Sequence, residues 1–321
     1  MLVIIVGGIS LGVVFLLGCV GEIITEKSGH LNLGIPGIMC MGAAGGCYAV
    51  ALYMNALPSA DKASWLLLVL VAVLGAAIVS AFGGLIYAVL TVSLRANQNV
   101  TGLALTTFGA GFAQFVMDTY VDRSRFSVAS KILRYSILGD ADWGWIGEIF
   151  FGHGVLVYLA IIIAVAAALV LKKTRIGLNL RAVGENPATA DAAGINVTAY
   201  KYGAILTGSG IAGLGGMFYI MDYIGGSWEN ASTIEGLGWL AIALVIFTLW
   251  KPDLSILGSF LFGMLYISSS VITGISFDMM KLLKLLPYVV TVIVLIVTSI
   301  LDSKENQPPA SLGLNYFREE R

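Results

Sequence analysis

Side chains that commonly perform chemistry are scarce in this chain of 321 residues. Its two histidines, His30 and His153, lie far apart, and neither an H-E-x-x-H zinc motif nor a G-x-S-x-G nucleophile motif occurs. The three cysteines, Cys19, Cys40 and Cys47, lie in apolar segments without CxxC spacing, which is typical of small hydrophobic residues and of neither a disulfide nor a zinc site. The sequence therefore predicts no catalytic residue, no metal site and no cofactor bound by this chain itself.

Nucleotide-binding motifs are also missing. No G-x-x-x-x-G-K-[ST] phosphate loop occurs, so any process driven by ATP requires hydrolysis on another chain. Residues 208–213 match G-x-G-x-x-G, but they lie inside an uncharged run with no strand before them. The spacing of Gly208, Ala212 and Gly216, with Ser209 and Gly213 beside them, instead predicts a helix face that packs closely against a neighbour.

Three acidic residues, Glu22, Asp222 and Glu235, lie within apolar segments or at their edges. Carboxylates inside a membrane are functional candidates, and ion coupling is the function they would suggest. All three lie near the ends of the segments, so a solvated or interfacial position is the favoured interpretation.

The apolar segments define the class of protein. The chain is 58% hydrophobic and 12% charged, with a mean hydropathy of +0.91, and uncharged runs long enough to cross a bilayer follow one another. With a net charge of −1 and no long basic run, it offers no surface for nucleic acid. We predict an all-α polytopic membrane protein with about nine transmembrane helices, near residues 2–24, 31–54, 65–93, 99–118, 153–171, 201–222, 233–250, 254–274 and 284–301.

An odd number of spans places the two termini on opposite sides of the membrane. Eleven of the eighteen Lys and Arg residues then fall on one side: Lys27, Arg95, Lys172, Lys173, Arg175, Arg181, Lys201, Lys251, Lys304, Arg318 and Arg321. Seven fall on the other: Lys62, Arg123, Arg125, Lys131, Arg134, Lys281 and Lys284. The positive-inside rule makes the first side cytoplasmic, with the N-terminus outside and the C-terminus inside.

This orientation divides the chain into regions. Residues 1–303 form the transmembrane domain, with an extracytoplasmic loop at 119–152 and a cytoplasmic segment at 172–200, and residues 304–321 form a cytoplasmic tail. In the outer loop, Trp143, Trp145 and Phe150 are spaced like an interfacial belt or a short surface helix. Aromatic anchoring at the headgroups is the favoured interpretation, and a docking surface is the alternative.

The second predicted span is unusual, because residues 29–37 read Gly-His-Leu-Asn-Leu-Gly-Ile-Pro-Gly and further glycines follow. Proline removes a backbone donor and glycine loosens a helix, so we expect this span to be bent or broken. Broken helices often line transport sites, which makes Asn32, Gly34, Pro36 and Gly37 candidate residues of a translocation pathway. Close packing between helices explains the small residues equally well.

The cytoplasmic segment contains a short helix with both ends marked. Asn186 is a good N-cap, Pro187 suits the first helical position, and Gly194 suits the left-handed stop. About two turns of helix are marginal alone in water, so this helix must be held by the protein's own helix ends or by a partner subunit. Docking of a partner is the sharper hypothesis.

Three patches resemble one family, the membrane permeases of bacterial ABC importers for nucleosides and simple sugars, related to the ribose and branched-chain amino-acid permeases. Residues 26–39 are similar to its E-R-[ST]-G-x-[IV]-N-[IL]-G-x-E-G-x-M stretch, and residues 174–195 to its T-x-x-G-x-x-x-R-A-x-G-x-N-P-x-A-A-x-x-A-G-I segment. Residues 309–319 are close to a P-x-x-L-G-x-P-Y-x-R-E ending typical of the nucleoside branch. Pro36 stands where the family commonly has Glu, and His30 replaces a small apolar residue; an interfacial position is favoured for His30.

The resemblance implies a permease in the bacterial plasma membrane that forms the pathway for a nucleoside or a simple sugar. It implies three partners: a cytoplasmic ABC ATPase that uses ATP and Mg²⁺, a second permease subunit, in a heterodimer or a homodimer, and an extracytoplasmic substrate-binding lipoprotein. The short helix would be the coupling helix, and the residues assigned to ATPase coupling are Arg175, Gly177, Arg181, Gly184, Glu185, Asn186, Pro187, Ala190 and Gly194. An ion-coupled secondary transporter or channel that acts without an ATPase is the alternative.

Overall fold

The structure is a computed structural model that describes residues 2–136, 144–272, 274, 276–301 and 307–317. Its long helices are α1 Leu2–Glu26, α2 Ile35–Ala56, α3 Trp65–Ala88, α4 Gln98–Tyr120, α7 Val155–Lys173, α10 Val197–Phe218, α11 Ser232–Phe247, α12 Pro252–Val271 and α14 Leu286–Leu301. The shorter helices are η1 Ala60–Lys62, η2 Val89–Ser93, α5 Arg123–Leu133, α6 Gly144–Phe150, α8 Arg175–Glu185, α9 Pro187–Ala192, η3 Tyr219–Tyr223 and α13 Phe277–Lys284. No strand occurs in the part of the chain that the structure describes, as an all-α fold requires.

The predicted spans correspond to helices. Eight stretches among the described residues are long and apolar enough to cross a membrane, and α11, with 16 residues, is a shorter apolar helix at the place of the seventh predicted span. The last span joins α13 to most of α14 as one apolar stretch, Asp278–Val297. The prediction of a polytopic helical membrane protein is confirmed.

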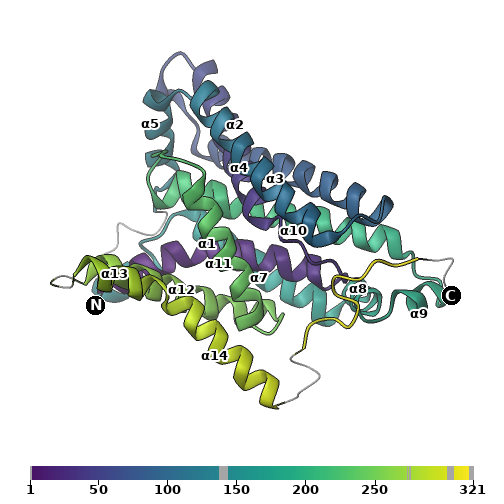
Figure 1. Ribbon diagram of the computed structural model, residues 1–321. Coiled ribbons are helices and arrows are strands. Elements are labelled where there is room, and N and C mark those ends of the chain that lie inside the picture. The colour runs from purple at the N-terminus through teal and green to yellow at the C-terminus, as the bar shows by residue number, and fades with distance from the viewer. Residues whose placement is uncertain (1, 137–143, 273, 275, 302–306, 318–321) are drawn as a thin grey trace.

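The turns between helices gather at two opposite ends of the bundle (Figure 1). One end, which we call the coupling end, contains residues 27–34, 94–97, 174–196, 248–251 and 307–317. Contacts join these segments: Gly29 O accepts from Gly313 N at 3.1 Å, and Glu26 accepts a hydrogen bond from Trp250 Nε1. The basic residues assigned to the cytoplasmic side that the structure describes lie in or beside these segments, whereas Lys304, Arg318 and Arg321 lie outside the described residues.

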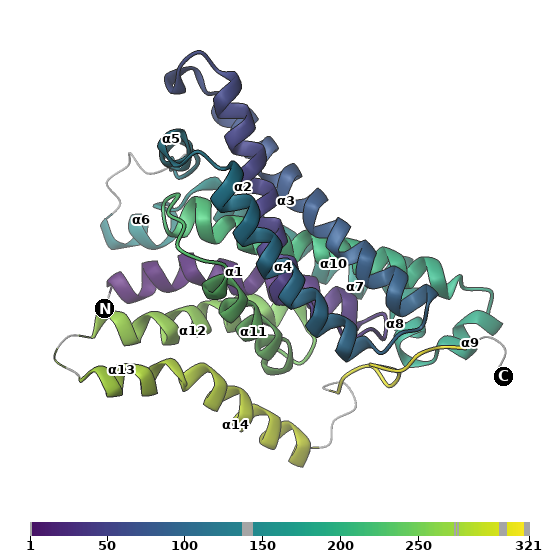
Figure 2. The same ribbon diagram turned by 45° about the horizontal axis from the view of Figure 1, so that its top comes forward.

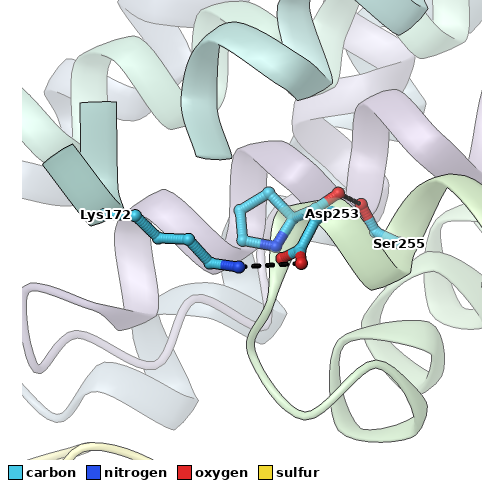
Figure 3. A network of polar contacts seen from close by, with 4 residues as sticks. Lys172, Asp253 and Ser255 are labelled. Atoms are coloured by element: carbon cyan, nitrogen blue, oxygen red, sulfur yellow. Dashed lines mark hydrogen bonds and ion pairs between the residues drawn. The ribbon is translucent and has the colours of Figure 1, made fainter. Parts of the chain in front are cut away.

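A surface ion pair also fastens the coupling end. Lys172, in the last turn of α7, donates to Asp253 Oδ2 in the first turn of α12 at 2.7 Å, and Ser255 Oγ donates to the Pro252 carbonyl beside it at 2.6 Å (Figure 3). Both charged side chains are about half exposed, so this pair contributes at most about 1 kcal/mol.

The opposite end contains the long loop with α5 and α6. Trp145 and Phe150 of α6 are largely exposed, which confirms a short surface helix with aromatic side chains; Trp143 lies outside the described residues. The start of α1 lies at this end and residues 307–317 lie at the coupling end (Figures 1 and 2), so the two ends of the described chain lie at opposite ends of the bundle, as predicted.

Helices α1, α2 and α10 form the buried centre of the bundle. In the most apolar 18-residue stretch of each span, 61% of the residues are buried in α1, 83% in α2 and 72% in α10 with η3. The corresponding share is 28% for α3 with η2 and 11% for the α13–α14 stretch. Low burial combined with high hydropathy is what lipid contact requires, and α14 lies at the margin of the bundle (Figure 2).

The expectation of a broken second span is wrong for the helix itself. Helix α2 runs without interruption, and Pro36 lies in its first turn, where proline replaces a backbone donor that has no helical partner. The irregular backbone lies before the helix, in residues 27–34. The later glycines serve close packing: a Cβ on Gly42 would lie 2.3 Å from the backbone of Gly213.

The glycine repeat of α10 also packs closely, as its spacing predicts. A Cβ on Gly208 would lie 2.4 Å from the carbonyl oxygen of Gly21 on α1, and one on Gly216 would lie 1.9 Å from that of Met39 on α2. Two helices therefore approach α10 at backbone distance, which only residues without a side chain allow.

Candidate functional site

The capped helix has the form that its sequence predicts. Asn186 Oδ1 accepts from Thr189 N at 2.9 Å, Pro187 begins α9, and Gly194 ends the segment with a φ of +84°. A carbonyl of its last turn is satisfied as well, because Ile195 N donates to Ala190 O at 3.0 Å. Both ends of a six-residue helix are thus closed by its own chain.

A second helix precedes it, which the sequence reasoning missed. Thr174 is the N-cap of α8, with its hydroxyl accepting from Gly177 N at 3.1 Å. Gly177 lets α8 fold back onto α7, because a Cβ there would lie 2.3 Å from the Val170 carbonyl. The available signal was Thr174 itself, because threonine is a favourable N-cap residue.

Helices α8 and α9 have a small hydrophobic core of their own. Val183, Ala190 and Val197 are buried together, and half-buried side chains, among them Tyr200 and Tyr316, pack around them. This core supplies the support that a two-turn helix needs. It also makes α8, α9 and the start of α10 one packed unit.

The polar and charged residues assigned to coupling lie on the outside of this unit. Arg175, Arg181, Glu185 and Asn186 are exposed, whereas Ala190 is buried. They are available to a partner at the coupling end, and their role in ATPase coupling stays a prediction. Gly184 has a different position, because it is buried beneath the tail.

The tail, residues 307–317, binds this unit to the rest of the coupling end (Figure 1). Ser311 donates to the Gly184 carbonyl twice, from N at 3.0 Å and from Oγ at 2.5 Å. Ala310 N donates to Glu185 Oε2 at 3.3 Å, and Tyr316 donates to Asp191 Oδ2 at 2.8 Å. The tail therefore contacts both α8 and α9.

The turn between α1 and α2 lies directly beneath α8. A Cβ on Gly184 would lie 2.3 Å from the Lys27 carbonyl, so the two backbones touch. This turn then leads to the four pathway candidates, all of which are buried. A displacement of α8 would therefore be transmitted to the start of α2 through backbone contact.

Hydrogen bonds hold the buried turn 27–34 in place. Asn32 N donates to Glu22 Oε1 and Asn32 Oδ1 accepts from Gly34 N, both at 2.9 Å. Tyr87 donates to the Leu31 carbonyl at 2.6 Å, and Thr106 donates to that of Leu33 at 2.8 Å. Side chains from α1, α3 and α4 thus satisfy a backbone that is buried and not helical.

The remaining pathway candidates lie where helices meet. Gly37 packs on α4, where a Cβ would lie 2.3 Å from the Leu105 carbonyl, and a Cβ on Gly238 of α11 would lie 2.5 Å from Pro36 Cα. In this conformation the four candidates are enclosed by α1, α2, α4 and α11. Their role in translocation stays a prediction.

The expectation of a solvated side chain is wrong for Glu22 and Asp222. Glu22 is fully buried and Asp222 is 6% exposed, so neither is solvated, whereas Glu235 is partly exposed as expected. His30 lies at the coupling end and is only 1% exposed; burial, with Lys201 nearby, lowers the pKa of His30 to about 3. Tertiary packing, which the local sequence does not reveal, covers these groups.

No group of three or more His, Cys, Asp or Glu side chains among the described residues is placed to hold a metal ion. The three cysteines are free and buried, in agreement with their interpretation as small hydrophobic residues.

Comparison of the sequence with known proteins assigns the chain to a family. The family model for the branched-chain amino acid transport system permease component matches residues 4–298. The nucleoside ABC transporter permease protein NupC of Lactococcus lactis subsp. cremoris is 34% identical over 303 residues, covering 93% of this chain and 92% of the relative.

Two further relatives agree. The guanosine ABC transporter permease protein NupQ of Bacillus subtilis is 30% identical, covering 87% of this chain and 86% of the relative. TsgC13 of Haloferax volcanii, provisionally named a glucose ABC transporter permease, is 32% identical, covering 78% of this chain and 72% of the relative. The chain belongs to the branched-chain amino acid transport system permease component family, and it is a multi-pass permease subunit of an ABC importer in the plasma membrane.

Proposed function

We propose that this permease forms the translocation pathway for nucleosides, with simple sugars as the second choice. The support for nucleosides is the name of two relatives that match nearly the whole chain, together with the Leu-Gly-x-x-Tyr tail found at residues 312–316. The support for sugars is the relative named for glucose. Specificity would also depend on an extracytoplasmic binding lipoprotein that delivers the substrate.

The chain itself catalyses no reaction in this proposal. ATP and Mg²⁺ are used by a separate cytoplasmic ABC ATPase, and the chain needs no cofactor of its own. The observation that carries the proposal is the doubly capped helix α9, packed on α8 and presented with the exposed side chains of Arg181, Glu185 and Asn186. A groove of the ATPase would take this surface.

The route from ATPase to pathway follows from the contacts. Closure of the ATPase would move α8 and α9 as one body, because they share a core and the cap residue Asn186. The contact of Gly184 with Lys27 would pass this motion to the turn before α2, which hydrogen bonds tie to α1, α3 and α4. Rigid-body displacement of packed helices is a common way to open and close a site.

A second permease subunit completes the pathway in this proposal. Support for a heterodimer comes from Lactococcus lactis subsp. cremoris, where two nucleoside permeases, NupC and NupB, both match this chain, NupB at 26% identity over 69% of it. A homodimer would be distinguished by copurifying two differently tagged copies.

The coupling role is tested by Ala190→Pro, with Ala192→Ser as the matched control. Proline at 190 removes the N–H that donates to Asn186 O at 3.0 Å and clashes with the preceding turn, whereas Ala192 is exposed. We expect Ala190→Pro to insert normally but to abolish ATP-driven nucleoside uptake and to weaken copurification of the ATPase. Undiminished uptake would contradict the proposal.

The alternative of an ion-coupled secondary transporter or channel loses one of its two motivations, because α2 is continuous. Purified protein in liposomes separates the two functions. We expect no gradient-driven uptake of a labelled nucleoside by the chain alone, and uptake once ATPase subunits, a second permease, the binding protein and ATP are present. Uptake by the isolated chain on an ion gradient would favour the alternative.

A further inference from the structure

A cavity of about 440 Å³ lies at the coupling end, beside α9 and beneath the tail. The α9–α10 turn, the end of η2, the turn before α2 and the tail each contribute to its walls. Its volume lies within the range of about 300–1,000 Å³ that is typical of small-molecule sites. Its lining is rich in polar side chains, among them Asn196, Thr198 and Asn315.

Two cations line this cavity without an anionic partner among the described residues. Lys201 is 3% exposed; its Nζ lies 5.9 Å from the centre of the Tyr316 ring and makes no hydrogen bond or ion pair there. Arg95 stacks its guanidinium 4.8 Å from the centre of the Phe317 ring. One acidic residue, Asp191, also lines the cavity and accepts a hydrogen bond from Tyr316, so the lining carries two positive charges against one negative charge. A buried ammonium group without a counter-ion is costly, so the cavity favours an anion.

Two further features distinguish this cavity from a packing defect. His30 lines it with 1% exposure, and its Nδ1 has no hydrogen-bond partner among the described residues. Arg95 has a φ of +57°, a left-handed conformation that is rare for a residue with a side chain, and Asn315 Nδ2 donates to its carbonyl at 2.8 Å. Strained backbone of this kind concentrates at functional sites.

We propose that this cavity binds a sugar phosphomonoester, either as a nucleotide or as a free sugar phosphate. The lining has more positive than negative charge, which favours an anion such as a phosphomonoester, with about −1.5 to −2 charges at pH 7. Arg95 supplies a forked donor for its oxygens. The neutral ring of His30 and the amides of Asn196 and Asn315 suit sugar hydroxyl groups, and the volume leaves room for them.

The position of the cavity gives such a ligand a consequence for coupling. Asn196 and Thr198 follow α9, while Asn315 and Tyr316 belong to the tail, so a bound ligand contacts both. It would hold α9 against the tail and the turn before α2, and so report the level of a cytoplasmic phosphate ester to the transporter. The inference does not depend on which substrate is transported.

Calorimetric titration of the purified full-length chain tests the site with adenosine 5′-monophosphate and ribose 5-phosphate as probes. Binding of adenosine, which lacks the phosphate, and of inorganic phosphate, which lacks the sugar, is measured for comparison. Dihexanoyl phosphatidate tests a lipid headgroup as the source of the phosphate. We expect at least one of the two sugar esters to bind at least tenfold more tightly than either comparison and more tightly than the phosphatidate.

Variants locate the binding. Lys201→Met removes the buried charge, and Arg95→Asn removes the other while keeping a residue that tolerates a left-handed φ. We expect each to weaken ester binding at least tenfold, while Lys173→Gln, an exposed lysine at the same end, leaves it unchanged. If Lys201→Met proves unstable in a melting assay, Arg95→Asn alone decides, because Arg95 is exposed.

The inference is overturned if no sugar ester binds saturably, if adenosine or inorganic phosphate binds as tightly, or if the phosphatidate is preferred. It is equally overturned if the Arg95→Asn variant binds the sugar ester as tightly as the Lys173→Gln variant does. Since the assay measures binding to the permease alone, a failed uptake experiment leaves this test unaffected.

Discussion

At the scale of single residues, the buried carboxyl of Glu22 satisfies the backbone of a turn that is not helical. Its Oε1 accepts from Asn32 N at 2.9 Å, and one turn further along α1, Glu26 accepts from Trp250 Nε1. Both acids therefore hold segments of the coupling end to α1. Without these acceptors, the backbone N–H of Asn32 and the indole N–H of Trp250 would be buried without a partner.

Glu22→Leu should lower the free energy of unfolding by about 1–3 kcal/mol, because it leaves the buried Asn32 N–H without an acceptor. Glu22→Gln keeps an acceptor oxygen and should cost less. Thermal melting of both variants in the same detergent measures the difference. Equal losses in the two variants would show that the hydrogen bond to Asn32 is not the reason for the acid.

Gly42→Val should also destabilise the protein, by about 1–3 kcal/mol or more, because it forces α2 away from Gly213. Gly203→Ala on α10 is the control, since a Cβ there meets nothing within 4 Å and alanine favours the helix by up to about 1 kcal/mol. Melting temperatures should therefore change in opposite directions. A neutral Gly42→Val would mean that the two helices are not in backbone contact.

At the scale of elements, the tail connects three segments that are distant in sequence. It bonds to Gly29 before α2, to Arg95 before α4 and to Gly184 at the end of α8. Its Gly313 has a φ of +79°, which allows the chain to turn between these contacts. The arrangement of the coupling end thus depends on a segment that crosses no membrane.

A chain that ends at residue 306 should insert normally but bind the proposed ATPase at least tenfold more weakly, because α8 and α9 lose their anchors. A chain that ends at residue 317 keeps every tail contact that the structure describes and is the matched control. Copurification of the ATPase and ATP-driven uptake measure the effect. Full coupling in the shorter chain would show that the tail plays no part in positioning α8 and α9.

At the scale of the whole molecule, the helices divide into a buried centre and a lipid-facing margin. The centre, α1, α2 and α10, contains the closest backbone contacts and the buried polar turn, and the margin, α3 and α14, is apolar and exposed. Through Gly184, the unit of α8 and α9 contacts the turn that joins α1 to α2, which belongs to the buried centre. In the proposed mechanism, motion of the ATPase would therefore act on the central helices and not directly on the lipid-facing ones.

Cysteine labelling tests the orientation of this arrangement. Lys62→Cys at the opposite end should react with a membrane-impermeant maleimide in intact cells, and Lys173→Cys at the coupling end should react only after the membrane is opened. Both positions are exposed, and the native cysteines are buried, so the parent chain is the blank. The reverse pattern would place the N-terminus inside.

Much of this protein follows from its sequence by itself. The long uncharged runs determine the spans, Asn186 with Pro187 and Gly194 determines a short capped helix, and the four-residue spacing from Gly208 determines a packing face. The physical reason is that lipid solvation, caps and helix periodicity act over a few neighbouring residues. For the same reason the sequence also separates the turns of the two ends correctly.

Only the tertiary structure decided how these parts meet. In the structure α2 is unbroken, the side chains of Glu22, Asp222 and His30 are buried, and the tail lies over Gly184. The burial of these three side chains and the position of the tail depend on residues far apart in the chain, such as Ser311 with Gly184. Local sequence cannot specify such contacts, because whether a polar group is solvated or buried depends on which distant segment packs over it.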